Sequence, residues 1–197
     1  MPEVARVFAR GLESARLTPS TAPVSFLSMT SAVKDEILET WETLCRDPHL
    51  RGIPYKVETD EFGRVLMSPT KNYHAFFASR INRLLEKLLA NGETANELAV
   101  RTPKGVKVPD AAWVSNVRRD IIFGESAASV APEICVEIIS DSNTEQAIAE
   151  KRQLYFAAGA REVWICQPNG QMQFFTVAGQ RPQSEVCPGF PSSVGKG

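Results

Sequence analysis

Glu137 stands at a position where folding alone would favour an apolar side chain. It lies between Val136 and Ile138, in a run from Glu133 to Ser140 that is apolar on both faces, as a buried central strand is. An unpaired carboxylate in such a strand is costly or becomes protonated. We therefore expect a cationic side chain to compensate Glu137.

Lys151 is the candidate for that cation. With about 100° of rotation per residue in a helix, Lys151 falls within the apolar face, close to Leu154 and Tyr155. Its helix is predicted to follow the strand of Glu137 directly, so it can pack back on the same sheet. That arrangement would bring the ammonium group toward the carboxylate.

Asp110 is the third residue of this kind. It precedes a strand predicted over residues 111–115, at an entry where the neighbouring proline is tolerated. Two carboxylates on adjacent strands that converge on one lysine suit a divalent-cation site for phosphodiester cleavage. The carboxylates would hold Mg²⁺, the metal would activate water, and the lysine would orient the nucleophile or balance charge.

Each of these residues also has a purely structural interpretation. Asp110 fits a turn or cap, Glu137 fits an edge-facing glutamate, and Lys151 fits a lysine whose stem covers apolar surface while its charge reaches solvent. The coincidence of all three favours a site over three separate structural roles.

The composition excludes several other classes of chemistry. The chain has 197 residues and a formal net charge of −1, so overall charge indicates neither nucleic acid nor a membrane as partner. Its two histidines, His49 and His74, exclude a multi-histidine metal site and disfavour a Ser-His-Asp triad. The four cysteines form no C-x-x-C pair and are expected to be reduced core thiols. No apolar stretch is long enough for a membrane span, so we expect a cytoplasmic protein that binds no membrane.

Periodicity and turn signals predict the elements that must position these side chains. The predicted order is a helix over 31–45, a hairpin over 55–67, a helix from a cap at 68–70 to 91, strands over 96–101, 111–115 and 133–140, a helix from a capping box at 142–145 to Gly159, and a hairpin over 163–177. This order predicts a mixed α/β chain with a central sheet. Residues 1–25 show no sustained period, so we expect a loosely ordered N-terminal arm followed by a single domain over 26–197.

Five short motifs follow one another along most of the chain. They are Glu58-(x)4-Gly63, Pro109-Asp110-Ala111-Ala112-Trp113-Val114, Val136-Glu137-Ile138-Ile139-Ser140, Lys151-(x)3-Tyr155-(x)3-Gly159-Ala160 and Val163-Trp164-Ile165-(x)2-Pro168. In this order and spacing, the series resembles the Uma-type branch of restriction endonucleases, within the PD-(D/E)XK nuclease superfamily. The resemblance covers about residues 50–176.

The resemblance implies a restriction-endonuclease-like α/β fold, in which helices flank a central mixed sheet, and a family often assembled as homodimers. It also implies that Asp110 and Glu137 are metal ligands, that Lys151 is the active-site lysine and that Glu58 is an additional acidic site residue. For Glu58, an exposed hairpin glutamate is the alternative. The superfamily's namesake pattern has lysine two positions after the acidic strand residue, where this chain has Ile139. Lys151, reaching in from the next helix, is the substitute.

The resulting hypothesis is a metal-dependent endonuclease that hydrolyses DNA with Mg²⁺ or Mn²⁺. Residues 71–119 carry nine Lys or Arg against four Asp or Glu, which favours a nucleic-acid partner but also fits the solvated faces of a helix and a loop. Ile139 favours an alternative, a catalytically inactive nucleic-acid or metal-binding module on the same fold. A third interpretation is an interaction protein in which Glu137 and Lys151 form only a buried ion pair.

Overall fold

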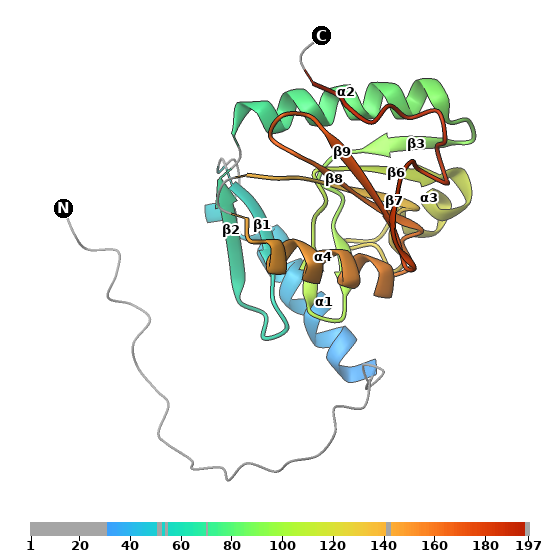
Figure 1. The fold of residues 1–197 in the computed structure, drawn as a ribbon. Helices are drawn as coiled ribbons and strands as arrows, with labels where there is room; N and C mark the ends of the chain where they lie inside the picture. The colour runs from blue at the N-terminus through green and yellow to red at the C-terminus, as the bar shows by residue number, and fades with distance from the viewer. Residues whose placement is uncertain (1–30, 51–52, 54, 70, 141–142, 196–197) are drawn as a thin grey trace, which may run out of the picture.

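A mixed sheet covered by helices forms the body of the molecule in a computed structural model that describes residues 31–50, 53, 55–69, 71–140 and 143–195 (Figure 1). The arm predicted over residues 1–25 lies outside the described residues. Within the described residues, the main sheet has six strands in the order β10-β9-β8-β7-β6-β3. Its strands are β3 (Gly92–Ala95), β6 (Ala111–Ser115), β7 (Ile134–Ile138), β8 (Glu162–Cys166), β9 (Met172–Thr176) and β10 (Gly179–Arg181).

The central strands β7 and β8 are parallel, and the other neighbouring pairs in this sheet are antiparallel. The parallel pair needs a crossover connection, which α4 (Glu145–Ala157) supplies. Because α4 both follows β7 in the chain and returns to β8, it packs against the sheet beside the strand that carries Glu137. The prediction of a central mixed sheet flanked by helices is therefore confirmed.

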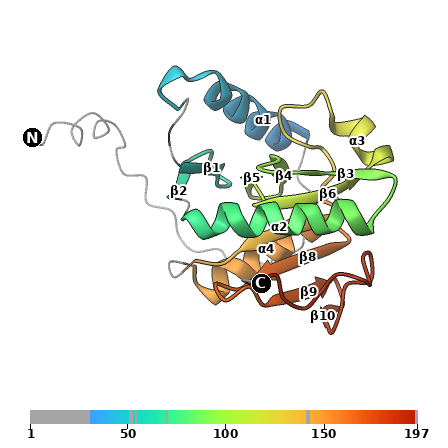
Figure 2. The same ribbon diagram turned by 90° about the horizontal axis from the view of Figure 1, so that it is seen from above.

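Two helices cover opposite faces of the sheet: in Figure 1 one lies above the strands and the other below them, and Figure 2 looks down on the upper one. The helix α2 (Asn72–Leu88) buries Ile81 and Leu85 against the face of β7 that carries Ile134 and Val136. The opposite face packs against α4, where Tyr155 is fully buried. Since side chains alternate along a strand, Glu137 points to the α4 face.

Two small hairpins lie beside the main sheet. One consists of β1 (Tyr55–Thr59) and β2 (Val65–Pro69), and the other of β4 (Val100–Thr102) and β5 (Gly105–Lys107). In the first, Asp60 Oδ1 accepts the backbone N–H groups of Phe62 and Arg64, and Gly63 has the positive φ of +72° that the turn requires. This confirms the predicted hairpin and its glycine turn.

The hairpins are held to each other, and α1 (Ser31–Arg46) packs Ile37 and Trp41 in one apolar cluster with Val106 of β5. Val106 N donates to Thr59 Oγ1 at 2.9 Å, and the Nζ of buried Lys107 donates to the carbonyl oxygen of Thr59 at 2.7 Å. The indole N–H of Trp41 on α1 donates to the carbonyl of Ser126, at 2.8 Å. The remaining short helices are η1 (Pro48–Leu50) and α3 (Asn116–Ile122).

Three local predictions were wrong. The strand expected over 96–101 is replaced by β3 and β4, because Glu97 adopts a φ of +53° that ends the extended backbone between them. The cap of the second helix is Lys71, since Pro69 completes β2 instead of opening the helix. The cap of α4 is Thr144, whose side chain accepts from Ala147 N, whereas Ser142 lies outside the described residues.

Several features were not predicted from the sequence. These are β5, α3, β10 and the packing of the C-terminal segment, where Phe190 contacts Trp164 with ring centroids 4.5 Å apart. The cysteine prediction is confirmed for the three buried thiols but is wrong for Cys45, which is exposed. No helix in the described part of the chain combines the length and apolar character needed to cross a bilayer.

Candidate active site

The four residues singled out in the sequence meet beside the ends of three strands. Glu137 comes from β7, Lys151 from α4, Glu58 from β1, and Asp110 immediately precedes β6. Asp110 N donates to the carbonyl oxygen of Val136 at 2.9 Å, which continues the β6–β7 pairing and sets Asp110 beside Glu137. Together with Lys56, these residues form what is here named the charged cluster.

Glu137 is the buried centre of the charged cluster. Both of its carboxylate oxygens lie 3.1 Å from Lys151 Nζ, and Tyr155, one helical turn further along α4, donates its hydroxyl to Oε1 at 2.6 Å. Burial alone would raise the pKa of Glu137, but the charges of Lys151 and Lys56 and the Tyr155 hydrogen bond bring that pKa down to about 2. Glu137 is thus a carboxylate at neutral pH, with the cationic compensation that its position requires.

Asp110 is held by the backbone of the neighbouring strand. Its Oδ2 accepts the backbone N–H of Ile138 at 2.6 Å, which fixes the carboxylate plane. Its Oδ1 is turned toward Lys56 Nζ, at 2.7 Å. The alternative of Asp110 as a turn or cap residue is therefore wrong, since the carboxylate faces a lysine of another element.

Lys56 is the member of the charged cluster that sequence reasoning missed. Its side chain is only 8% exposed, and Nζ contacts both Asp110 Oδ1 and Glu137 Oε2, the latter at 3.2 Å. Burial alone would lower the pKa of Lys56, but the neighbouring carboxylates outweigh it and raise that pKa above its usual range. Strand periodicity could have identified this lysine, because residues 56 and 58 share one face of β1.

Glu58 completes the charged cluster from the hairpin. Its Oε1 lies 2.7 Å from Lys151 Nζ and also accepts the backbone N–H of Val108, at 2.9 Å. The side chain is buried. The alternative of an exposed hairpin glutamate is therefore wrong, and Lys151 is held between two carboxylates from different elements.

The first turn of α2 borders the same region. Tyr73 donates its hydroxyl to the carbonyl of Ile139, at 2.9 Å, which ties this helix end to the segment after β7. His74 Nε2 is buried and has no hydrogen-bond partner among the described residues. Burial lowers the pKa of His74, with the charge of Asp110 acting in the opposite direction, so this imidazole is neutral at neutral pH.

The donor set of the charged cluster fits a hard divalent cation that keeps much of its water. Among the described residues, no three His, Cys, Asp or Glu side chains are already arranged as a metal cage. Asp110 and Glu137 nevertheless each have one oxygen anchored by a protein donor, Ile138 N–H or the Tyr155 hydroxyl. The second oxygen of each faces the same ammonium group. Two carboxylate oxygens plus water or substrate oxygens are the kind of ligand set that Mg²⁺ accepts.

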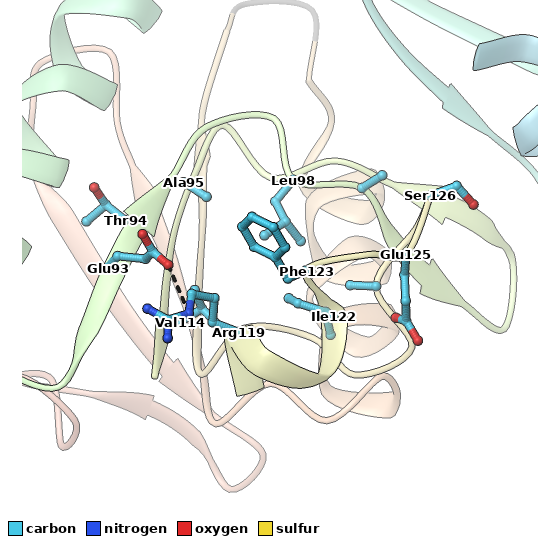
Figure 3. Close-up of a pocket in the computed structure, with 12 residues that line it drawn as sticks. Glu93, Thr94, Ala95, Leu98, Val114, Arg119, Ile122, Phe123, Glu125 and Ser126 are labelled. Atoms are coloured by element: carbon cyan, nitrogen blue, oxygen red, sulfur yellow. Dashed lines mark ion pairs between the residues drawn. The ribbon is translucent and has the colours of Figure 1, made fainter. Parts of the chain in front are cut away.

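A separate surface pocket of about 300 Å³ lies between β3 and α3 (Figure 3). Its wall is largely apolar, with Leu98, Ile122 and Phe123 pointing into it, and Glu93 pairs with Arg119 at 3.4 Å along one side. The residues that line this pocket include none of the charged cluster. This pocket is therefore separate from the candidate active site.

Carboxylates and a lysine gathered at the strand ends of a helix-flanked mixed sheet define a nuclease-like α/β protein. The chain belongs to the Uma2 family, described as "Putative restriction endonuclease", whose model matches residues 49–189. The family expected from the sequence motifs is thus confirmed.

A solved structure shares the fold. It is the crystal structure of a putative nuclease belonging to DUF820 from Anabaena variabilis ATCC 29413, with a TM-score of 0.52 and 18% identity. The match covers 66% of this chain and 73% of that chain. No curated protein matches this chain significantly.

Proposed function

We propose that this protein is a metal-dependent endonuclease that hydrolyses DNA phosphodiester bonds, with Mg²⁺ or Mn²⁺ held by Asp110 and Glu137. The observation that carries the proposal is that Asp110 Oδ1 and Glu137 Oε2, from adjacent strands, face one ammonium group, that of Lys56, at 2.7 and 3.2 Å, while Lys151 Nζ lies 3.1 Å from both oxygens of Glu137. A buried ion pair between Glu137 and Lys151 alone would not require Asp110 to present an oxygen to the ammonium group that Glu137 Oε2 also faces.

The residues of the charged cluster would have different roles in metal binding and catalysis. A bound divalent ion would supply Lewis-acid activation of water and charge neutralisation at the scissile phosphate. Glu137, with a pKa of about 2, stays ionised over the whole range in which a nuclease works. Lys151 is positioned by Glu58 and Glu137 so that its ammonium can orient the attacking water or stabilise charge that develops on phosphate oxygens.

DNA as the substrate is supported by the family and by local charge. The family is described as "Putative restriction endonuclease", and residues 71–119, which include Asp110, carry nine basic against four acidic side chains. Phosphate contacts depend on such local positive charge even where the whole chain is near neutral.

The second candidate function is a module that binds nucleic acid or metal on this fold without cleavage. Ile139, at the position of the superfamily's usual lysine, favours it. The two candidates differ in one outcome, since a binding module would take up Mn²⁺ and DNA but leave a supercoiled plasmid intact.

Plasmid nicking in Mg²⁺ or Mn²⁺ tests the proposal, with calorimetry to follow metal binding. We expect nicking by the wild type and a loss of at least about a hundredfold in Asp110→Asn and Glu137→Gln. Asp120→Asn, which removes an exposed carboxylate of α3, is the matched control and should leave the rate unchanged. Metal binding without nicking would favour the inactive module, and absence of metal binding would favour the buried ion pair.

A further inference from the structure

The two carboxylates proposed as metal ligands each have one oxygen anchored by an uncharged protein donor and the other turned toward lysine. Asp110 Oδ2 is held by Ile138 N–H, and Glu137 Oε1 by the Tyr155 hydroxyl. The remaining oxygens, Asp110 Oδ1 and Glu137 Oε2, both face Lys56 Nζ, at 2.7 and 3.2 Å, and Glu137 Oε2 also lies 3.1 Å from Lys151 Nζ. The protein therefore presets both carboxylate planes and places an ammonium group between the two oxygens that are left.

Lys56 is a buried residue and not a surface lysine. Its side chain is 8% exposed, comparable with the acids that it contacts. The strand that carries it is fixed at its other end, where Glu58 accepts Val108 N–H and Thr59 accepts Val106 N–H. The backbone of β1 is paired with β2 along its whole length, so withdrawal of the ammonium group would be a change of side-chain rotamer that leaves the backbone at Glu58 in place.

Resting on the function proposed above, we infer that Lys56 is the resident counter-ion of Asp110 and Glu137 and that its ammonium competes with the divalent cation for the same two carboxylate oxygens. The metal and the ammonium would occupy the site in turn.

Charge explains why one cation should replace the other. The three carboxylates and two ammonium groups of the charged cluster leave it with a net charge of −1. A divalent ion bound with Lys56 in place would make the cluster positive, with two cations crowded onto the same oxygens. Binding with Lys56 withdrawn brings the cluster to neutrality, and like-charge repulsion at a separation of a few ångströms is strong in a partly buried site.

Titration of metal-free protein with Mn²⁺ alone tests the inference, with calorimetry and thermal unfolding as readouts. Lys56→Met keeps most of the length of the side chain and removes its charge, and we expect it to bind Mn²⁺ at least about tenfold more tightly than the wild type. Lys56→Arg keeps the charge and should bind no more tightly than the wild type. Lys87→Met, which removes an exposed lysine in the last turn of α2, should leave affinity unchanged.

The outcomes separate this inference from the proposed function. If the wild type binds Mn²⁺ and Lys56→Met binds it equally or more weakly, competition is wrong while the metal site stands. If neither protein binds Mn²⁺, the metal-dependent function itself is wrong. Should Lys56→Met fail to fold without metal, Lys56→Gln is titrated in its place; if that also fails, refolding by Mn²⁺ supports the inference and failure to refold overturns it.

Discussion

Removal of the Lys151 charge should destabilise the protein as well as impair catalysis. Lys151→Met leaves Glu58 and Glu137 buried and short of one ammonium group. Removing one partner of a buried pair typically costs about 3–5 kcal/mol. Here the lysine side chain is 20% exposed, and Glu137 keeps Lys56 and Tyr155 as partners, so we expect a loss nearer about 2–3 kcal/mol.

Thermal and denaturant unfolding measure this loss. For a chain of this size, about 2–3 kcal/mol corresponds to a decrease in Tm of about 5–10 °C. The matched control is Lys104→Met. This variant breaks the ion pair between Lys104 and Glu150 of α4, in which both side chains are about half exposed. Such a pair is worth about 0–1 kcal/mol. If the two variants were destabilised equally, the charged cluster would not be an energetically coupled unit and the reasoning would fail.

A double-mutant cycle measures the coupling energy between Glu58 and Lys151. Glu58→Gln in the Lys151→Met background removes one of the two carboxylates left without their lysine. We expect the double variant to be more stable than the sum of the single losses predicts, by about 0.5–3 kcal/mol. Additive losses would mean that the 2.7 Å contact between Glu58 and Lys151 contributes nothing to stability.

Three further outcomes follow from the same contacts. The pKa of Glu137 is about 2 in the folded protein, below its ordinary 4.5, so its contribution to stability is complete above about pH 4.5 and is lost as the pH falls toward 2. Glu137→Gln should therefore flatten the dependence of the unfolding free energy on pH between these two values. An unchanged slope would contradict the assignment. Tyr155→Phe removes one hydrogen bond to Glu137 and should reduce nicking by about tenfold with the fold intact, because partners behind a metal ligand orient it; an undiminished rate would exclude that role. Gly105→Ala places a Cβ against the carbonyl oxygens of Thr59 and Asp60, at a backbone φ of +84° that favours glycine, so we expect both a lower Tm and slower nicking. Gly124→Ala is the control, because its Cβ meets open space and should change neither quantity.

Burial arguments were the most informative part of the sequence for this site. Glu137 and Lys151 were recognisable because a charge in a buried strand and a charge on an apolar helix face need each other, and helix α4 returns to the sheet beside the strand that it follows. These relations depend only on period and chain order, which a sequence displays directly.

Lys56 escaped the same reasoning because its strand alternates apolar Tyr55 and Val57 with charged Lys56 and Glu58, so the period places Lys56 beside Glu58 but on a face that is typical of a solvated one. The hairpin strand β2 is exposed along its whole length, and β1 has only two fully buried residues, Glu58 and Thr59. The contacts of β1 with residues 105–108 show that the face with Lys56 and Glu58 closes over the site.

The missed strands have a similar cause. Short strands such as β4 and β5 have three residues each, too few to establish a period. The left-handed backbone at Glu97, which separates β3 from β4, occurs at a residue type that gives little warning of it.

Ile139 looks like a defect when the superfamily pattern is read along one strand, but its surroundings give it another role. Residues two apart share a strand face, and Ile139 packs against the buried cluster that includes Tyr155 of α4, the same helix that carries Lys151. A lysine at 139 would remove an apolar contact from the helix and add a third ammonium group beside Glu137. An apolar residue at position 139 packs beside α4, and α4 provides the lysine, Lys151. Ile139→Lys should therefore lower the Tm and fail to restore nicking to Lys151→Met; a rescued rate would show that the two positions are interchangeable.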